Sequence, residues 1–101
     1  MMEEKGYHKL LIWQRARELV KLVYFVSGKF PESEKHNLTS QIRRAAISVV
    51  LNISDGSLVE VEACLELALD LGFLSKPDFE KVEAVRRELG AMLNSFIKNL
   101  K

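Results

Sequence analysis

The sequence predicts an all-α fold, a bundle of four helices that each bury one face. Apolar residues recur at alternating spacings of three and four along its segments, as in helices that pack side by side. Glycine and proline residues punctuate the chain between these segments. Hydrophobic residues make up 48% of the 101 residues, enough for one modest core, so we expect a single domain over residues 1–101.

The first helix is expected from about His8 to Gly28. Its seam has spacings of four and three and consists of Ile12, Ala16, Leu19, Val23, Val26 and Phe30. Trp13 and several other apolar residues lie outside this seam, so the helix carries more apolar surface than one partner covers. Gly28 and Phe30-Pro31 mark its end, and Ser33 is the candidate cap of the next helix.

The second helix starts near Leu38 and is expected to end at Gly56, because glycine readily adopts the left-handed conformation that closes helices. At 100° per residue it has two apolar sides. The first is a stripe of Leu38, Ile42, Ala45, Ala46, Val49 and Ile53. The second, on roughly the opposite side, consists of Ile47, Val50 and Leu51. One helix therefore serves two apolar partners.

A polar stripe lies beside the first apolar stripe of this helix. It consists of Asn37, Gln41, Arg44, Ser48, Asn52 and Asp55. One interpretation is a small-molecule pocket, lined by Gln41, Ser48, Asn52 and Asp55. The favoured interpretation is hydrogen bonding across helices or capping, because buried amides and hydroxyls require partners and fix helix register.

The third segment, Leu58 to Leu71, fits two patterns. Its apolar residues alternate with mostly polar ones, as in a strand. A helical seam is also present, formed by Leu58, Val61, Leu65 and Ala68. Leucine, glutamate and alanine are strong helix formers, and a lone strand would have nothing to pair with, so we predict a helix.

The fourth helix follows a turn at Gly72–Ser75. Ser75 is its expected cap, with Pro77 in the first turn. Its apolar residues are Phe79, Val82, Val85, Leu89, Met92, Leu93, Phe96, Ile97 and Leu100. Gly90 costs about 1 kcal/mol relative to alanine inside a helix, and a close helix crossing is the explanation we expect.

The charges are divided along the chain. Fifteen basic and fourteen acidic residues give a net charge of +1, which offers no overall electrostatic case for nucleic-acid binding. Basic residues cluster in Arg15, Arg17, Lys21, Arg43 and Arg44, whereas the third segment is purely acidic, with Glu60, Glu62, Glu66 and Asp70. Contact with phosphate is one interpretation of the arginines. Ion pairs at a helix or subunit boundary are the favoured one.

The sequence contains no recognised catalytic pattern. No nucleophile lies in a catalytic motif, there is no phosphate-binding loop, and Cys64 lacks nearby basic residues that would lower its pKa. His8 and His36 lack the further ligands of a tetrahedral metal site, since only Glu32 lies at helical spacing from His36. We therefore expect no enzymatic activity, no cofactor and no metal.

The cysteine content and hydropathy indicate a cytoplasmic protein. Cys64 is the single cysteine, so no intrachain disulfide forms, and its apolar neighbours suggest burial. Residues 1–9 lack the apolar core of a signal peptide, and no apolar run approaches the roughly 18 residues of a membrane span. We expect no membrane partner.

Several ordered motifs resemble one protein family, the four-helix-bundle proteins encoded in intervening sequences of bacterial large-subunit (23S) ribosomal RNA genes. These motifs are Leu11–Ala16, Phe30-Pro31 with Glu34, Leu38–Ala46 with Ser48, and Asn52–Ser57. Leu71–Leu74 and Leu93-Asn94 extend the resemblance towards the end of the chain.

The resemblance implies an antiparallel up-and-down four-helix bundle without enzymatic activity, from a family that tends to form ring-shaped homopentamers. A related branch, the accessory proteins of diversity-generating retroelements, binds nucleic acid and a reverse transcriptase through a basic surface. The chain departs from the family after Gly56-Ser57, where a basic loop and the first part of a long third helix are absent. We therefore expect a short third helix that leaves part of its neighbours uncovered.

Two functions from different classes follow. The first is a homo-oligomer, of five copies if the family pattern holds, whose interface uses Trp13, Ile47, Val50 and Leu51, because monomers rarely expose so much apolar surface. The alternative is binding of RNA or another nucleic acid by the assembled oligomer. Its phosphate contacts would be Arg15, Arg17, Lys21, Arg43 and Arg44.

Overall fold

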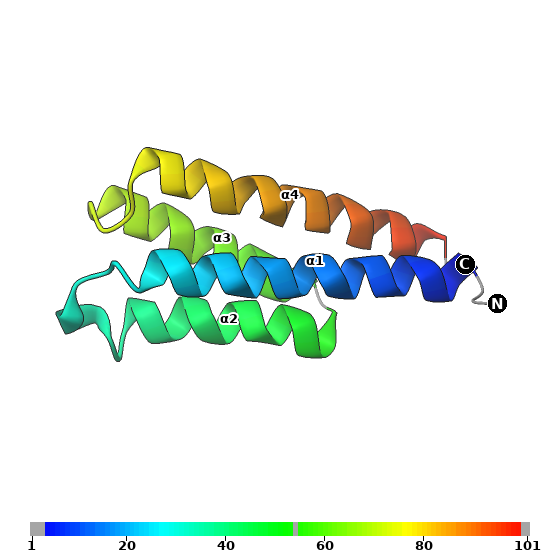
Figure 1. Ribbon diagram of the computed structural model, residues 1–101, viewed down its shortest axis with the longest axis horizontal. Helices are drawn as coiled ribbons and strands as arrows, with labels where there is room; N and C mark the ends of the chain where they lie inside the picture. Colours follow the sequence, from blue (N-terminus) through cyan, green and yellow to red (C-terminus); the bar gives the residue numbers. More distant parts are fainter. Residues whose placement is uncertain (1–3, 54, 100–101) are drawn as a thin grey trace.

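The computed structural model describes residues 4–53 and 55–99, and these residues form four α-helices and one short 3-10 helix. They are α1 (Glu4–Ser27), η1 (Glu32–Glu34), α2 (Leu38–Asn52), α3 (Asp55–Asp70) and α4 (Lys76–Lys98). Figure 1 shows that each helix runs antiparallel to the one before it. α4 also packs against α1, so α1 and α3 lie on one diagonal of the bundle. The predicted up-and-down four-helix bundle is confirmed.

The core contains the seams that the sequence predicts. All six predicted seam residues of the first helix are buried, from Ile12 to Phe30. The third segment is a helix, and its predicted seam residues Leu58, Val61, Leu65 and Ala68 are buried as well. In α4 the prediction fails at Ile97, which is 45% exposed because α2 and α3 do not reach that end of the bundle. Leu100 lies outside the described residues.

Two of the four helices are short. α2 and α3 have 15 and 16 residues, whereas α1 and α4 have 24 and 23. At 1.5 Å per residue, α1 is about 36 Å long and α3 about 24 Å. Figure 1 shows the start of α1 and the end of α4 projecting beyond the other two helices. The predicted short third helix is confirmed, and α2 is equally short.

The turn between α2 and α3 differs from the prediction. α2 ends at Asn52, and Ile53 closes it with a left-handed φ of 47°, donating its N–H to the Val49 carbonyl at 2.8 Å. Gly56 instead lies in the first turn of α3. The chain must reverse before Gly56 because Ser57 of α3 already donates a hydrogen bond to Ser48 of α2 at 2.8 Å. A β-branched residue rarely adopts positive φ, and this one is retained by half-burial against the core.

Capping was predicted correctly for α4 and incorrectly for α2. The Ser75 side chain accepts a hydrogen bond from the Asp78 N–H at 3.2 Å, as expected for an N-cap. Ser33 lies within η1 and does not cap α2. The first amide of α2, that of Leu38, donates to the Glu34 carboxylate at 3.3 Å instead, because η1 brings that side chain over the helix start.

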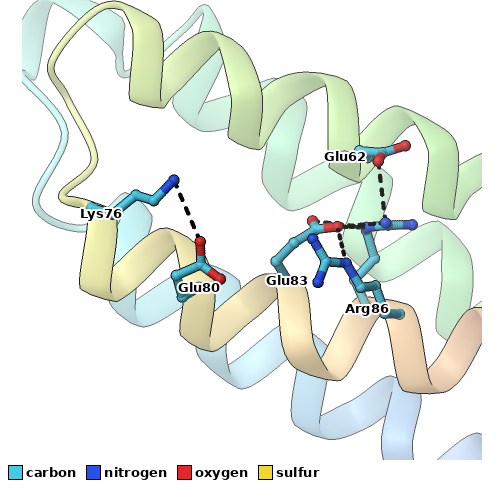
Figure 2. A network of polar contacts seen from close by, with 6 residues as sticks. Glu62, Lys76, Glu80, Glu83 and Arg86 are labelled. Atoms are coloured by element: carbon cyan, nitrogen blue, oxygen red, sulfur yellow. Dashed lines mark hydrogen bonds and ion pairs between the residues drawn. The ribbon is translucent and has the colours of Figure 1, made fainter.

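A network of ion pairs joins α3 to α4 (Figure 2). Glu83 of α4 is 2% exposed and is paired with Arg86 one turn later. Arg86 also reaches Glu62 of α3, so one guanidinium links two carboxylates from neighbouring helices. Figure 2 places this network beside the separate pair of Lys76 and Glu80 at the start of α4.

None of the helices in the described part of the chain combines the length and apolar content needed to cross a membrane.

Candidate interaction surface on helices α1 and α2

One outer side of α1 and α2 brings together most of the residues that the sequence singles out. Trp13, Arg17, Lys21 and Tyr24 follow one another at spacings of four, four and three, and so share one side of α1. The adjacent side of α2 carries Arg43, Arg44, Ile47, Val50 and Leu51. We call these nine residues the α1–α2 face. It holds all four predicted interface residues and four of the five predicted phosphate contacts.

The apolar end of the α1–α2 face is an open hollow where α2 and α3 stop short. Trp13, Val50 and Leu51 line it, and Phe96 and Ile97 of α4 complete it. Leu51 is 76% exposed and Trp13 is 42% exposed, although both are large apolar side chains. The expectation that a short third helix leaves its neighbours uncovered is therefore confirmed.

The other end of the face is a basic hollow. It is lined by Tyr24, Lys35, His36, Thr39, Ser40, Arg43, Arg44 and Ile47. Four of these residues are basic in type, and none of the lining residues carries a carboxylate. Lys35 and His36 were not among the predicted site residues. The sequence signal that would have found them is a repeat of four residues, from Lys35 through Thr39 to Arg43 and from His36 through Ser40 to Arg44.

Arg43 is held in place at the edge of the basic hollow. Its Nε donates to the hydroxyl of buried Ser27 at 2.8 Å, and its Nη2 donates to the Tyr24 carbonyl at 3.4 Å. The guanidinium also lies over the Tyr24 ring, 4.5 Å from its centroid. Arg43 thus ties α2 to α1, and part of its donor capacity is already used.

Arg17 and Arg44 each make fewer contacts than Arg43. The Arg17 guanidinium lies 4.7 Å from the centre of the Trp13 ring, so an aromatic and a cationic group form one unit on α1. Arg44 is exposed and donates to the Ser40 hydroxyl at 3.3 Å. Within the described part of the chain, neither of these two arginines forms an ion pair with a carboxylate.

Arg15 is separated from the other predicted phosphate contacts. It lies on the side of α1 that faces α4 and pairs with Glu18 at 2.7 Å and Glu88 at 3.1 Å. The hydrogen bond to Glu18 is the main reason that the pKa of its guanidinium is raised. Two carboxylates therefore already neutralise Arg15.

The polar stripe of α2 faces α3. Gln41 donates to the Glu60 carboxylate, and Asn52 donates to Ser48 at 3.0 Å. The bond from Asn52 stays within α2, whereas the bonds from Gln41 to Glu60 and from Ser57 to Ser48 join α2 to α3, as the favoured interpretation of the stripe expected. The side chain of Asp55 lies outside the described residues.

The outer side of α3 carries acidic residues, whereas the α1–α2 face carries basic ones. Val59 is 62% exposed and Leu67 is 52% exposed, and Ala63 lies between them on the same side. Glu66 and Asp70, also exposed, accompany this apolar row. We call Val59, Ala63, Glu66, Leu67 and Asp70 the α3 ridge. The acidic character of this segment was evident from the sequence, whereas the exposure of its apolar residues was not predicted.

The described residues contain no group of three or more histidine, cysteine, aspartate or glutamate side chains that could hold a metal ion. Cys64 is buried, and this burial, with a smaller effect of Glu60, raises the pKa of its thiol. A protonated, covered thiol is a poor nucleophile.

Comparison with known protein families found a match to part of the chain. The model of a family described as 23S rRNA-intervening sequence protein matches residues 8–56. This span runs from α1 through α2 to the second residue of α3, so it contains the whole α1–α2 face and stops where the short third helix begins. A search of curated proteins found no match.

Proposed function

Because the chain belongs to the family of 23S rRNA-intervening sequence proteins, we propose that it is a non-enzymatic protein that self-associates through its α1–α2 face. The role of the assembly is macromolecular interaction. A ring of five copies is the order that we propose, since the resemblance to the family implies it. The proposed location is the cytoplasm, where a lone cysteine such as Cys64 stays reduced.

The observation that carries the proposal is the exposure of large apolar side chains on one continuous surface. Leu51, Trp13 and Ile47 are 76%, 42% and 37% exposed. Monomeric proteins rarely expose contiguous apolar patches of this kind, and interfaces favour tryptophan, tyrosine and arginine, which this face also carries. Association would remove this apolar surface from water.

The side chains with shifted pKa values lie outside the α1–α2 face. Catalytic sites concentrate side chains with perturbed pKa values in one cleft. Here Arg15, Asp78 and Arg86 owe their shifts chiefly to hydrogen bonds with ion-pair partners, and Cys64 owes its shift to burial. None of these four residues belongs to the α1–α2 face. Each shift has a structural cause.

The solution mass of the chain tests the proposal. Light scattering after size exclusion should give a multiple of 11.5 kDa for the wild type, five times that value for the proposed ring. Ile47→Lys combined with Leu51→Lys should reduce the mass to 11.5 kDa, because two ammonium groups in an apolar contact would have to lose their hydration. Ala84→Lys with Asn94→Lys, at two exposed positions of α4, is the matched control and should keep the wild-type mass.

Circular dichroism would verify that both variants remain helical. A wild-type monomer would refute the proposal. So would an Ile47→Lys, Leu51→Lys variant that keeps the mass of the wild type.

The basic hollow favours a second candidate function, binding of RNA by the assembled oligomer. Lys35, His36, Arg43 and Arg44 line it without a carboxylate, and rows of such side chains repeated over several subunits suit a phosphate backbone. It ranks second because the net charge is only +1 and because Arg15 and Lys35 already pair with carboxylates. Arg43 and Arg44 also belong to the α1–α2 face, so self-association through that face would compete with RNA for them.

Titration of a labelled single-stranded RNA at increasing salt tests this candidate. Binding through phosphates must weaken steeply with salt, and Lys35→Gln with Arg44→Gln should reduce both the affinity and the salt dependence. Arg15→Gln is the control and should have little effect, since this arginine already forms ion pairs with Glu18 and Glu88. Absence of binding at low salt, or equal losses in both variants, would exclude the basic hollow as the RNA site.

A further inference from the structure

We infer that the partner of the α1–α2 face is the α3 ridge of a second copy, so that subunits pack head to tail. The inference rests on the self-association proposed above and names the second surface that the contact requires. It follows from the charges, the apolar rows and the positions of the two surfaces.

The α3 ridge is an apolar row with negative charges beside it. α3 has five acidic residues and no basic residue, namely Asp55, Glu60, Glu62, Glu66 and Asp70. Within the chain, Glu60 accepts a hydrogen bond from Gln41, and Glu62 forms an ion pair with Arg86. The side chain of Asp55 lies outside the described residues. Glu66 and Asp70 take part in no ion pair in the described part of the chain, although the pKa of Arg86 is raised mainly by its hydrogen bond to Glu83 and to a minor extent by the charge of Glu66.

The α1–α2 face has the complementary arrangement. Its apolar side chains Trp13, Ile47 and Leu51 lie beside cationic ones, Arg17, Lys21 and Arg44. A helix whose apolar residues recur every four positions, as Val59, Ala63 and Leu67 do, presents one ridge that fits a groove between two helices. Opposite charges then flank the same apolar contact on both sides.

Symmetric pairing of the α1–α2 face with itself is disfavoured. It would join two surfaces that both carry Arg17, Arg43 and Arg44, and juxtaposed like charges disfavour such a contact. Within the described residues α3 does not pack against α1, so the ridge and the α1 part of the face lie on diagonal helices, while Leu67 and Arg44 line one hollow where α2 meets α3. A contact between two different surfaces is heterologous, and repeating it generates a closed ring or a filament.

Charge reversal on each surface tests the inference by solution mass. Glu66→Lys with Asp70→Lys reverses the α3 ridge, and Arg17→Glu with Arg44→Glu reverses the opposite surface. Each double variant alone should fall to the mass of one chain, 11.5 kDa. The variant with all four changes should recover the wild-type mass, since the charges are again opposite. An equimolar mixture of the two double variants should also be heavier than either alone.

The control is Glu32→Lys with Glu80→Lys, which makes the same charge change at exposed positions away from α3 and should keep the wild-type mass. All the substituted side chains are exposed, and circular dichroism would confirm the helical content. If Glu66→Lys with Asp70→Lys keeps the wild-type mass while Ile47→Lys with Leu51→Lys loses it, the head-to-tail inference is overturned and the proposed self-association stands. A second outcome would also count against the inference. If both double variants and the quadruple variant all have a mass of 11.5 kDa, pairing of opposite charges between the two surfaces is refuted.

Discussion

The guanidinium of Arg86 contacts both carboxylate oxygens of buried Glu83, with distances of 2.9 Å from Nε to Oε1 and to Oε2. The hydrogen bond to Glu83 is the main cause that raises the pKa of Arg86. Glu62 of α3 accepts a further bond from Arg86 at 3.2 Å (Figure 2). Arg87 lies 3.4 Å from Glu83. A charge that is 2% exposed is tolerated here because it has several cationic partners.

Arg86→Met should lower the free energy of unfolding by about 3 kcal/mol, because it leaves the Glu83 carboxylate buried with only Arg87 nearby. Urea denaturation followed by circular dichroism measures this change. Lys76→Met is the control, since its pair with Glu80 is exposed and should contribute at most about 0.5 kcal/mol. Similar effects of the two substitutions would contradict the importance of burial. Glu83→Leu combined with Arg86→Met should recover most of the loss, because no charge remains buried.

Gly90→Ala should raise the free energy of unfolding by up to about 1 kcal/mol. A Cβ at this position would lie 3.9 Å from Leu58 Cδ1, which is ordinary van der Waals contact, so the close helix crossing expected from the sequence is wrong. Gly72→Ala is the contrasting variant. Gly72 has a φ of +79°, and alanine there should cost about 1 kcal/mol or more. Thermal unfolding distinguishes the two signs, and a destabilising Gly90→Ala would contradict the assigned contact.

Asp78 should make the stability of the chain depend on pH in acid. Lys29 donates to its carboxylate at 2.9 Å, and this hydrogen bond is the main reason that the pKa of Asp78 is lowered. A lowered pKa in the folded state means that the unfolded chain binds more protons. The stabilisation is therefore complete above the ordinary pKa of 3.8 and is lost as the pH falls through the lower folded value.

The free energy of unfolding of Asp78→Asn, measured from neutral pH down to strong acid, checks this dependence. The variant should be less stable than the wild type near neutral pH, and the difference should vanish in strong acid. Glu80→Gln, at an exposed position of the same helix, should follow the wild-type profile closely. A constant difference between Asp78→Asn and the wild type at all pH values would contradict the assignment.

Cys64 should react slowly with alkylating reagents in the folded protein. Its thiol is buried, and burial raises its pKa, so both access and the thiolate fraction are reduced. Labelling with iodoacetamide, quantified by mass spectrometry, should be fast only when urea unfolds the chain. A native rate equal to that of the unfolded chain would show that the thiol is accessible.

The periodic apolar seams allowed most of the fold to be predicted. Burial of Ile12, Leu19 and Val61 follows from spacings of three and four. A helix repeats every 3.6 residues, so these residues share one side, and the hydrophobic effect buries that side in the core. The Ser75 cap was predictable for a similar local reason, since its hydroxyl satisfies a nearby backbone amide. The end of α2 at Ile53 was not predictable from the sequence. Packing against α3 places Ile53 at the left-handed position that closes the helix, where the local preference is for glycine.

The four helices, their buried sides and the division of charge were predictable because each depends on residues close together in the chain. The neighbour that each remaining side chain meets depends on the packing of distant segments. Arg15 and Arg17 are two residues apart, yet one reaches the carboxylates of α1 and α4 and the other lies on the Trp13 ring. Helical periodicity sets the direction of a side chain, whereas the packing of distant segments sets its partner.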